Sequence, residues 1–184
     1  GERLAKELGS KVYDREFIRM AAQRSGIDEQ YIAKNEQSIP SFWLKCILSK
    51  NSEQPVEASL SADDILFVAE SRIVQELAAQ EPCIIVGRCA DFVLKDHPKV
   101  VKVFCYSDLK SAVNRCVNDY GIPQEQAEAE IRRINRNRIH HYEYYTGQKW
   151  GEPHHYHLML NTGNISLETA CKLVKEVYQN IAKA

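Results

Sequence analysis

The 184-residue chain lacks the features that mark membrane proteins, disulfide-rich secreted proteins and strongly basic nucleic-acid-binding proteins. Its formal net charge is −1, so no overall field draws it to nucleic acid or to an anionic membrane surface. No apolar run approaches the roughly 18 residues that cross a bilayer, and no signal peptide is recognisable. The six cysteines form no CxxC pair, which favours free thiols in a reducing compartment. We therefore expect a cytoplasmic protein that binds neither nucleic acid nor a membrane.

The composition, with 44% hydrophobic and 27% charged residues, is that of an ordinary globular domain. A chain of this length forms one substantial core, so we predict a single domain over residues 1–184. Short apolar runs alternate with helical patterns, which is typical of parallel βαβ units in an α/β fold. The predicted strands cover residues 82–87, 100–106 and 158–161. Capping residues predict that helices begin after Asp14, Ser61, Ser107 and Ser166.

The strongest local signal is the apolar run from Cys83 to Val86, which ends abruptly in Gly87 and Arg88. Such a run is typical of a strand buried on both faces, and ligands of open parallel sheets gather beyond the carboxyl ends of the strands. Gly87 lets the backbone turn sharply. Arg88 then presents a planar fork that suits phosphate or carboxylate, with Asp91 three residues further on. The pattern predicts a phosphate-handling site.

A second signal is the arginine-rich segment from Arg132 to Arg138. On a helix, Arg132, Arg133 and Arg136 fall within one narrow sector, whereas Arg138 points elsewhere. One interpretation is a solvated basic face whose charges are offset by nearby acids. Those acids are Glu125, Glu128 and Glu130. The other interpretation is a polyphosphate site, because phosphoryl transfer needs cations around the phosphate oxygens.

Histidines and aromatics near the carboxyl end leave alternatives open. If His155 and His157 lay on one strand they would share a face, which would allow a zinc site, but the spacing supplies no third ligand and we favour a polar loop. The aromatic residues could stack on a base or pack against the core, and we favour packing. They are Tyr142, Tyr144, Tyr145 and Trp150. Phe42 and Trp43 could anchor a homodimer.

Five segments occur in an order that resembles the cytidylate-kinase-like family of P-loop nucleoside monophosphate kinases. The segments are residues 12–16, 87–91, 132–138, 142–150 and 156–162. The resemblance covers nearly the whole chain except residues 37–60. It implies a three-layer, P-loop NTPase-like α/β fold in which a parallel sheet is flanked by helices. It also implies a helical lid over residues 122–147 and a variable, acceptor-binding insert over residues 36–60.

The resemblance further implies that the γ-phosphoryl group of ATP, with Mg²⁺, is moved to a nucleoside monophosphate such as CMP. Lid cations would act on the donor phosphates as catalytic residues. They are Arg132, Arg133 and Arg136. The implied acceptor-binding residues are Asp14, Arg88, Asp91 and Arg138. Small-molecule nucleotides would be the partners, and a homodimer is possible.

Three features depart from the family pattern. No glycine-rich phosphate loop with its lysine is present, nor the strand before it, and the first helical residues resemble the helix that would follow that loop. We therefore expect the loop upstream of Gly1. Asn135 stands where related enzymes often have aspartate, and His157 stands where an acid would be expected. The alternative function is a nucleotide-binding protein of the same fold with weak or no catalysis.

Overall fold

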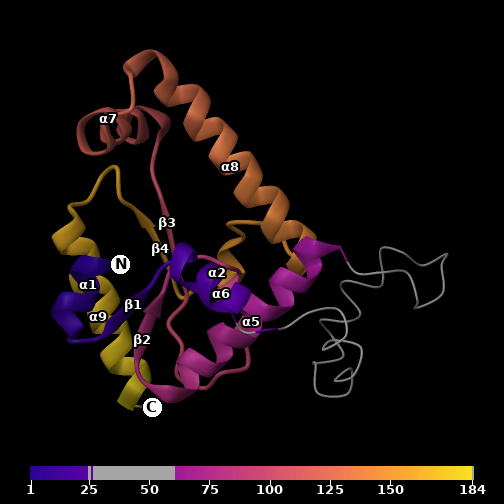
Figure 1. The fold of residues 1–184 in the computed structure, drawn as a ribbon. Coiled ribbons are helices and arrows are strands. Elements are labelled where there is room, and N and C mark those ends of the chain that lie inside the picture. Colours follow the sequence, from indigo (N-terminus) through magenta and orange to yellow (C-terminus); the bar gives the residue numbers. More distant parts are fainter. Residues whose placement is uncertain (25, 27–60, 184) are drawn as a thin grey trace. The chain divides into compact units, whose positions relative to one another are not determined.

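The computed structural model describes residues 1–24, 26 and 61–183. Helices predominate and the strands are short and parallel, which confirms the mixed α/β class (Figure 1). The chain divides into two compact units, which are described separately. The first unit comprises Gly1–Leu94 and Tyr145–Gly147, and the second comprises Lys95–Tyr144 and Gln148–Ala184. The expected insert at 36–60, with Phe42 and Trp43, lies outside the described residues.

The described residues of the first unit hold one pair of parallel strands. Its elements are α1 (Glu2–Leu8), β1 (Lys11–Tyr13), α2 (Arg15–Arg24), α5 (Ala62–Gln80), β2 (Cys83–Ile85) and α6 (Ala90–Val93). In the parallel register, Lys11 lies opposite Cys83 and Tyr13 lies opposite Ile85. The backbone N–H of Val86 donates to the carbonyl oxygen of Tyr13 at 2.9 Å. The carboxyl ends of β1 and β2 therefore meet at one edge of the sheet.

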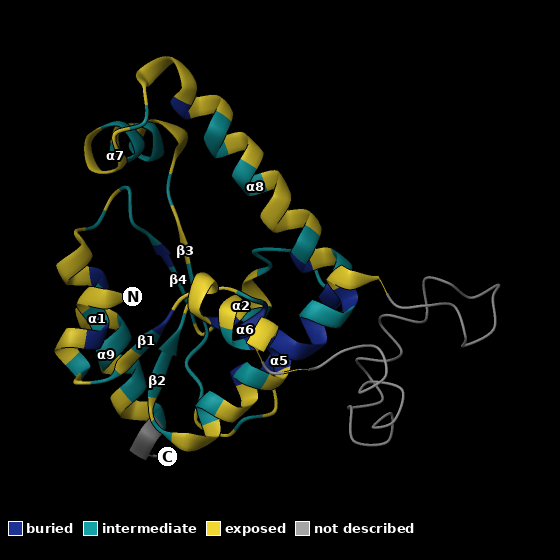
Figure 2. Ribbon diagram, in the orientation of Figure 1, coloured by how far each residue is buried: buried dark blue, intermediate teal, exposed yellow. Residues whose placement is uncertain are grey.

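Helix α5 carries much of the core of the first unit, as its dark segment in Figure 2 indicates. Its start is fixed by the predicted capping box, in which Ser61 and Asp64 each accept the backbone N–H of the other at 3.2 Å. Further along, Phe67 is buried and its ring stacks on that of Tyr145, with 3.9 Å between centroids. Val74 is fully buried about two turns later. These contacts make α5 a firm support for side chains on the same face.

The second unit holds the other strand pair. Its elements are β3 (Val103–Tyr106), α7 (Leu109–Tyr120), α8 (Gln124–Thr146), the 3₁₀ turn η2 (Pro153–His155), β4 (Leu158–Asn161) and α9 (Leu167–Lys183). The last residues of α8 belong to the first unit. Strands β3 and β4 pair in parallel, with Val103 opposite Leu158. The rings of Phe104 and Trp150 form a T-shaped pair with a centroid distance of 4.9 Å. This aromatic contact covers β3 with the segment that precedes β4.

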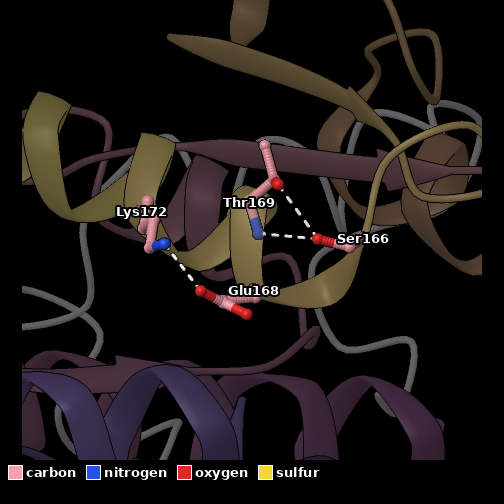
Figure 3. A network of polar contacts seen from close by, with 4 residues as sticks. All are labelled: Ser166, Glu168, Thr169 and Lys172. Atoms are coloured by element: carbon pink, nitrogen blue, oxygen red, sulfur yellow. Dashed lines mark hydrogen bonds and ion pairs between the residues drawn. The ribbon is translucent and has the colours of Figure 1, made fainter.

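Side-chain caps fix the helix starts in the second unit. Ser166 accepts the backbone N–H of Thr169 at 3.0 Å at the start of α9, as predicted (Figure 3). One turn further, Lys172 pairs with Glu168 at 2.6 Å (Figure 3). At α7 the prediction was wrong by one residue, because Asp108 rather than Ser107 is the cap and accepts the N–H of Ser111 at 2.9 Å.

Several local predictions need correction. Strand β2 ends at Ile85 rather than Gly87, because the backbone of Gly87 takes a positive φ of 80° that a strand cannot contain. Strand β3 begins at Val103 rather than near residue 100. Where one larger sheet was expected, the described strands form two two-stranded sheets. The three-layer P-loop arrangement therefore stays a prediction.

The histidines do not share a strand, contrary to the condition set for a zinc site. His155 ends η2 and His157 precedes β4, where its Nδ1 accepts the backbone N–H of Lys102 at 3.0 Å. Across residues 1–24, 26 and 61–183, no three His, Cys, Asp or Glu side chains gather closely enough to hold a metal ion. Within the same residues, no helix combines the length and apolar character needed to cross a membrane.

Candidate functional site

The turn after β2 has an unusual backbone. Gly87, Arg88 and Cys89 are three consecutive residues in the left-handed region, with φ of 80°, 55° and 52°. A residue with a Cβ is disfavoured there by roughly 1–2 kcal/mol, and such strain gathers at functional sites. The N–H groups of Phe92 and Val93 donate to the carbonyl oxygen of Cys89 at 2.9 and 2.8 Å, and both side chains are buried. Helix α6 thus holds the strained turn in place.

The turn places the side chain of Arg88 next to the buried carboxylate of Glu70. Nη1 of Arg88 lies 2.9 Å from Oε2 of Glu70, and the two side chains are only 11% and 1% exposed. Glu70 belongs to α5, so the ion pair joins that helix to the end of β2. Among the described residues, Nε of Arg88 and Oε1 of Glu70 have no hydrogen-bond partner. The guanidinium group is therefore held at one corner by a carboxylate that water does not reach.

Two further arginines, from α2, act on the same pair. Arg15 and Arg19 both interact electrostatically with Glu70 and with Arg88. Burial raises the pKa of Glu70 above its ordinary value, and the charges of Arg88, Arg19 and Arg15 oppose that rise. Three arginine charges thus act on one carboxylate, in a chain whose overall charge is −1. This arginine cluster (Arg15, Arg19 and Arg88 around Glu70) is a local positive site that suits an anion.

The structure brings Asp14 to the same sheet edge as Arg88. Asp14 follows β1, and its Oδ1 accepts the N–H of Phe17 at 2.8 Å at the start of α2. Asp91 lies in the first turn of α6, three residues beyond Arg88. Between them, burial raises the pKa of the Cys89 thiol to about 12. Cys89 is therefore a neutral core group and no nucleophile.

The other predicted site residues lie on α8. In the second unit, Arg132 pairs with Glu128 at 2.7 Å and Arg133 pairs with Glu130 at 2.6 Å, and both arginines are exposed. These ion pairs match the solvated-face interpretation of the arginine-rich segment. The polyphosphate interpretation is untested and stays a prediction.

On the same helix, Nη1 of Arg138 donates to Oδ1 of Asn135 at 3.3 Å. Arg136 is exposed. The convergence of these arginines with Arg88, which belongs to the other unit, on one ligand stays a prediction.

A model of the cytidylate kinase-like family matches residues 1–164 of this sequence. The chain belongs to the cytidylate kinase-like family. Among solved structures, an uncharacterized protein from Eubacterium ventriosum ATCC 27560 is similar, with a TM-score of 0.72. The two share 19% sequence identity, and the match covers 97% of this chain and 89% of the other, which shows a common fold. No curated protein matches the chain.

Sequence reasoning missed Arg15, Arg19 and Glu70 in this family member. A signal for Glu70 was present, because it lies three residues after Phe67 and four before Val74 on the apolar face of α5. A carboxylate on such a face needs a partner. The signal for the two arginines is their spacing of four residues directly after Asp14, which gives one helix face. What the sequence could not supply is that α2 and α5 pack together.

The aromatic residues near the end of α8 pack, as the preferred interpretation predicted. Tyr142 and Tyr145 are buried, and the hydroxyl of Tyr142 donates to Oε1 of Gln148 at 3.2 Å. Trp150 packs against Phe104. These side chains therefore contribute to the cores of their units in the family fold.

Proposed function

We propose that this protein is an ATP-dependent nucleotide kinase that transfers the γ-phosphoryl group of ATP to a pyrimidine nucleoside monophosphate such as CMP. Family membership over residues 1–164 supports the reaction class. The observation that carries the proposal is the buried Arg88–Glu70 pair at the carboxyl end of β2, inside a cluster of three arginines. A fixed guanidinium in a positive surrounding suits the phosphate of an acceptor nucleotide.

At the acceptor end, Arg88 binds the monophosphate through the N–H groups that Glu70 leaves available. Its fork geometry allows two parallel hydrogen bonds to phosphate oxygens. Asp14 and Asp91 flank Arg88 and contact other polar groups of the acceptor. Arg138 binds the same phosphate from α8. This set orients the acceptor oxygen for in-line attack on the γ-phosphorus.

At the donor end, three arginines of α8 surround the transferred group. They are Arg132, Arg133 and Arg136. Arg132 and Arg133 pair with Glu128 and Glu130 of the same helix, and both arginines are solvent-exposed, so phosphate oxygens can replace these partners at little cost. An acceptor oxygen forms a bond to the γ-phosphorus while the bond to the bridging oxygen of ADP breaks. The cations stabilise the charge that spreads over the equatorial oxygens.

Mg²⁺, when bound, would offset the negative charge of the donor phosphates. We propose that the ion arrives as a complex with the nucleotide. The proposal also includes the finer fold prediction, a single P-loop kinase-like domain with a lid over residues 122–147. We further propose that residues 36–60 form an acceptor-binding insert, that the protein is cytoplasmic and that it can form a homodimer.

The test is a coupled assay of ADP formation by the full-length protein, with ATP, Mg²⁺ and each common nucleoside monophosphate in turn. We expect turnover on the order of 1–100 per second with a pyrimidine monophosphate. Arg88→Gln should lose most of it. Arg72→Gln, which removes an exposed arginine on α5, is the matched control and should retain it. Absence of turnover with every acceptor would contradict the proposal.

A second candidate is a nucleotide-binding protein of the same fold without transfer activity. Asn135 favours it, because its amide accepts from Arg138 but carries no charge to balance the lid cations. Calorimetry decides between the two. Micromolar nucleotide binding with no turnover would support this candidate, whereas turnover at the rate above would exclude it.

A further inference from the structure

Glu70 is the most buried charged side chain among the described residues of the first unit, yet the proposed transfer reaction gives it no role. We infer that Glu70 is a positioning residue that holds the guanidinium of Arg88 in the orientation needed to bind the acceptor phosphate. The inference rests on the proposed function and deepens it, because it assigns the acceptor site a residue on α5 that never contacts the ligand.

The geometry fixes both ends of the pair. Glu70 shares a helix face with Phe67 and Val74, which are buried in the core, so its position follows that of α5. The main chain of Arg88 is fixed by the left-handed turn and by the hydrogen bonds of α6. Between these supports, the 2.9 Å contact from Nη1 to Oε2 sets the direction of the guanidinium plane. Arg88 thus meets its ligand without an entropic cost of ordering its long side chain.

Stability alone does not account for this pair. A buried ion pair is often no more stabilising than apolar residues of the same volume, because both ions lose their hydration. Here burial raises the pKa of Glu70, which means that the fold disfavours its charged form despite three nearby arginines. The pair also lies beside a turn that stores backbone strain. A costly arrangement held by a rigid surrounding is the pattern expected of a preorganised ligand site.

Charge balance gives a second argument. A carboxylate that only neutralised its neighbours would leave little attraction for a ligand. Arg15 and Arg19 keep the arginine cluster positive after Glu70 has paired with Arg88. Within this cluster the positive charges outnumber the negative one, which attracts an anionic phosphomonoester. Glu70 therefore orients one cation while the other two preserve the field.

The experiment measures binding of CMP, of inorganic phosphate and of cytidine to the full-length protein by calorimetry without ATP. Two variants separate the effect of the charge of Glu70 from that of its side-chain length. Glu70→Gln keeps the length and removes the charge, whereas Glu70→Asp keeps the charge and shortens the side chain. We expect Glu70→Asp to weaken CMP binding about tenfold and Glu70→Gln about threefold, as the loss or weakening of one charge-assisted hydrogen bond implies. Cytidine binding should not change.

The matched control is Glu76→Gln. Glu76 lies on the same helix and pairs with Arg72 at 2.8 Å, but this pair is half-exposed, so its loss should leave CMP binding unchanged. Combining Glu70→Gln with Arg88→Gln adds a coupling test. If Glu70 acts through Arg88, the double variant should bind CMP no more weakly than Arg88→Gln alone. Thermal melting confirms that each variant is folded.

The inference is overturned if both Glu70 variants bind CMP as the unchanged protein does or more tightly, because Glu70 is then only a counter-charge. Equal weakening of CMP and cytidine would also overturn it, by pointing to general damage. If the binding results hold but no acceptor is phosphorylated, the proposed kinase function fails and the positioning role stands. If the unchanged protein binds neither CMP nor phosphate, both fail.

Discussion

Arginine meets glutamate in two contrasting surroundings in this molecule. In the first unit, Arg88 and Glu70 form a pair that is almost entirely enclosed, joining the end of β2 to α5. In the second unit, Arg132 and Arg133 pair with glutamates of their own helix, one turn away, in contact with solvent. The donor and acceptor groups are the same. Only burial and the origin of the partner differ.

This difference indicates which arginine is held in one position and which can exchange its glutamate partner for a ligand. An exposed ion pair within one helix contributes little to stability, because water and salt screen it. Its arginine can therefore exchange the glutamate for a phosphate group. A buried pair between two elements cannot open without leaving a bare charge in the core. We expect the first kind to suit a lid that closes on a substrate, and the second to suit a preformed pocket.

The largest effect should come from Arg88→Ala. It leaves the Glu70 carboxylate buried without its partner, which should reduce the free energy of unfolding by about 3–5 kcal/mol. Urea denaturation measures the loss. Arg72→Ala, on the exposed side of α5, should lose only a small fraction of it. A loss for Arg88→Ala as small as that of the control would contradict the contrast between buried and exposed pairs.

The next effect concerns the exposed pairs. Arg133→Gln should leave thermal stability nearly unchanged, because its pair with Glu130 lies in solvent. It should nevertheless lower kcat of the proposed reaction by tenfold or more, roughly the effect of removing one donor to the transferred group. Lys172→Gln, which removes a similar exposed pair on α9, should change neither quantity. A stability loss without a loss of turnover would reverse the roles assigned to the lid.

Local chemistry made part of this contrast predictable. The capping box of Ser61 and Asp64 was read correctly because its partners lie three residues apart. The helical lid over residues 122–147, which corresponds to α8, and the family itself both followed from the order of the sequence segments. Arg88 was singled out because a strand ends just before it. In each case the interactions that decide the outcome lie close together in the chain.

The partners of Arg88 could not be predicted in the same way. Glu70 is 18 positions earlier, and Arg15 and Arg19 are more than 60 positions away. Their approach depends on the pairing of β1 with β2 and on the packing of α2 against α5. The end of β2 was also predicted too late. The apolar run continues to Val86, but β2 ends at Ile85, just before the turn in which Gly87 has a positive φ.

The strained turn offers a smaller test of the contrast. Gly87→Ala meets no atom within 4 Å, so its cost comes from backbone conformation alone, about 1–2 kcal/mol of unfolding free energy. Gly121→Ala, at the end of α7, faces the same penalty with φ of 66° and open space. Denaturation should show similar losses for both. Only Gly87→Ala should also weaken CMP binding, and equal binding by the two would remove the turn from the acceptor site.

The smallest effect is the pH dependence that distinguishes a buried carboxylate from an exposed one. Burial raises the pKa of Glu70 in the folded state above its ordinary value of 4.5. Its contribution to stability is therefore fully present below that ordinary value and is lost as pH rises through the folded pKa. Glu70→Gln cannot ionise. The stability of the unchanged protein minus that of Glu70→Gln should fall as pH rises toward neutrality, which urea midpoints across this range would measure.

Glu81 provides the control of opposite sign. Hydrogen bonds from Lys11 and Tyr13 lower the pKa of Glu81 below its ordinary value. Its contribution to stability is present above that value and is lost as pH falls through the folded pKa. The difference between the unchanged protein and Glu81→Gln should therefore rise with pH where that for Glu70→Gln falls. Parallel slopes would mean that Glu70 is ionised as easily as a surface carboxylate, and the distinction between the two kinds of pair would be lost.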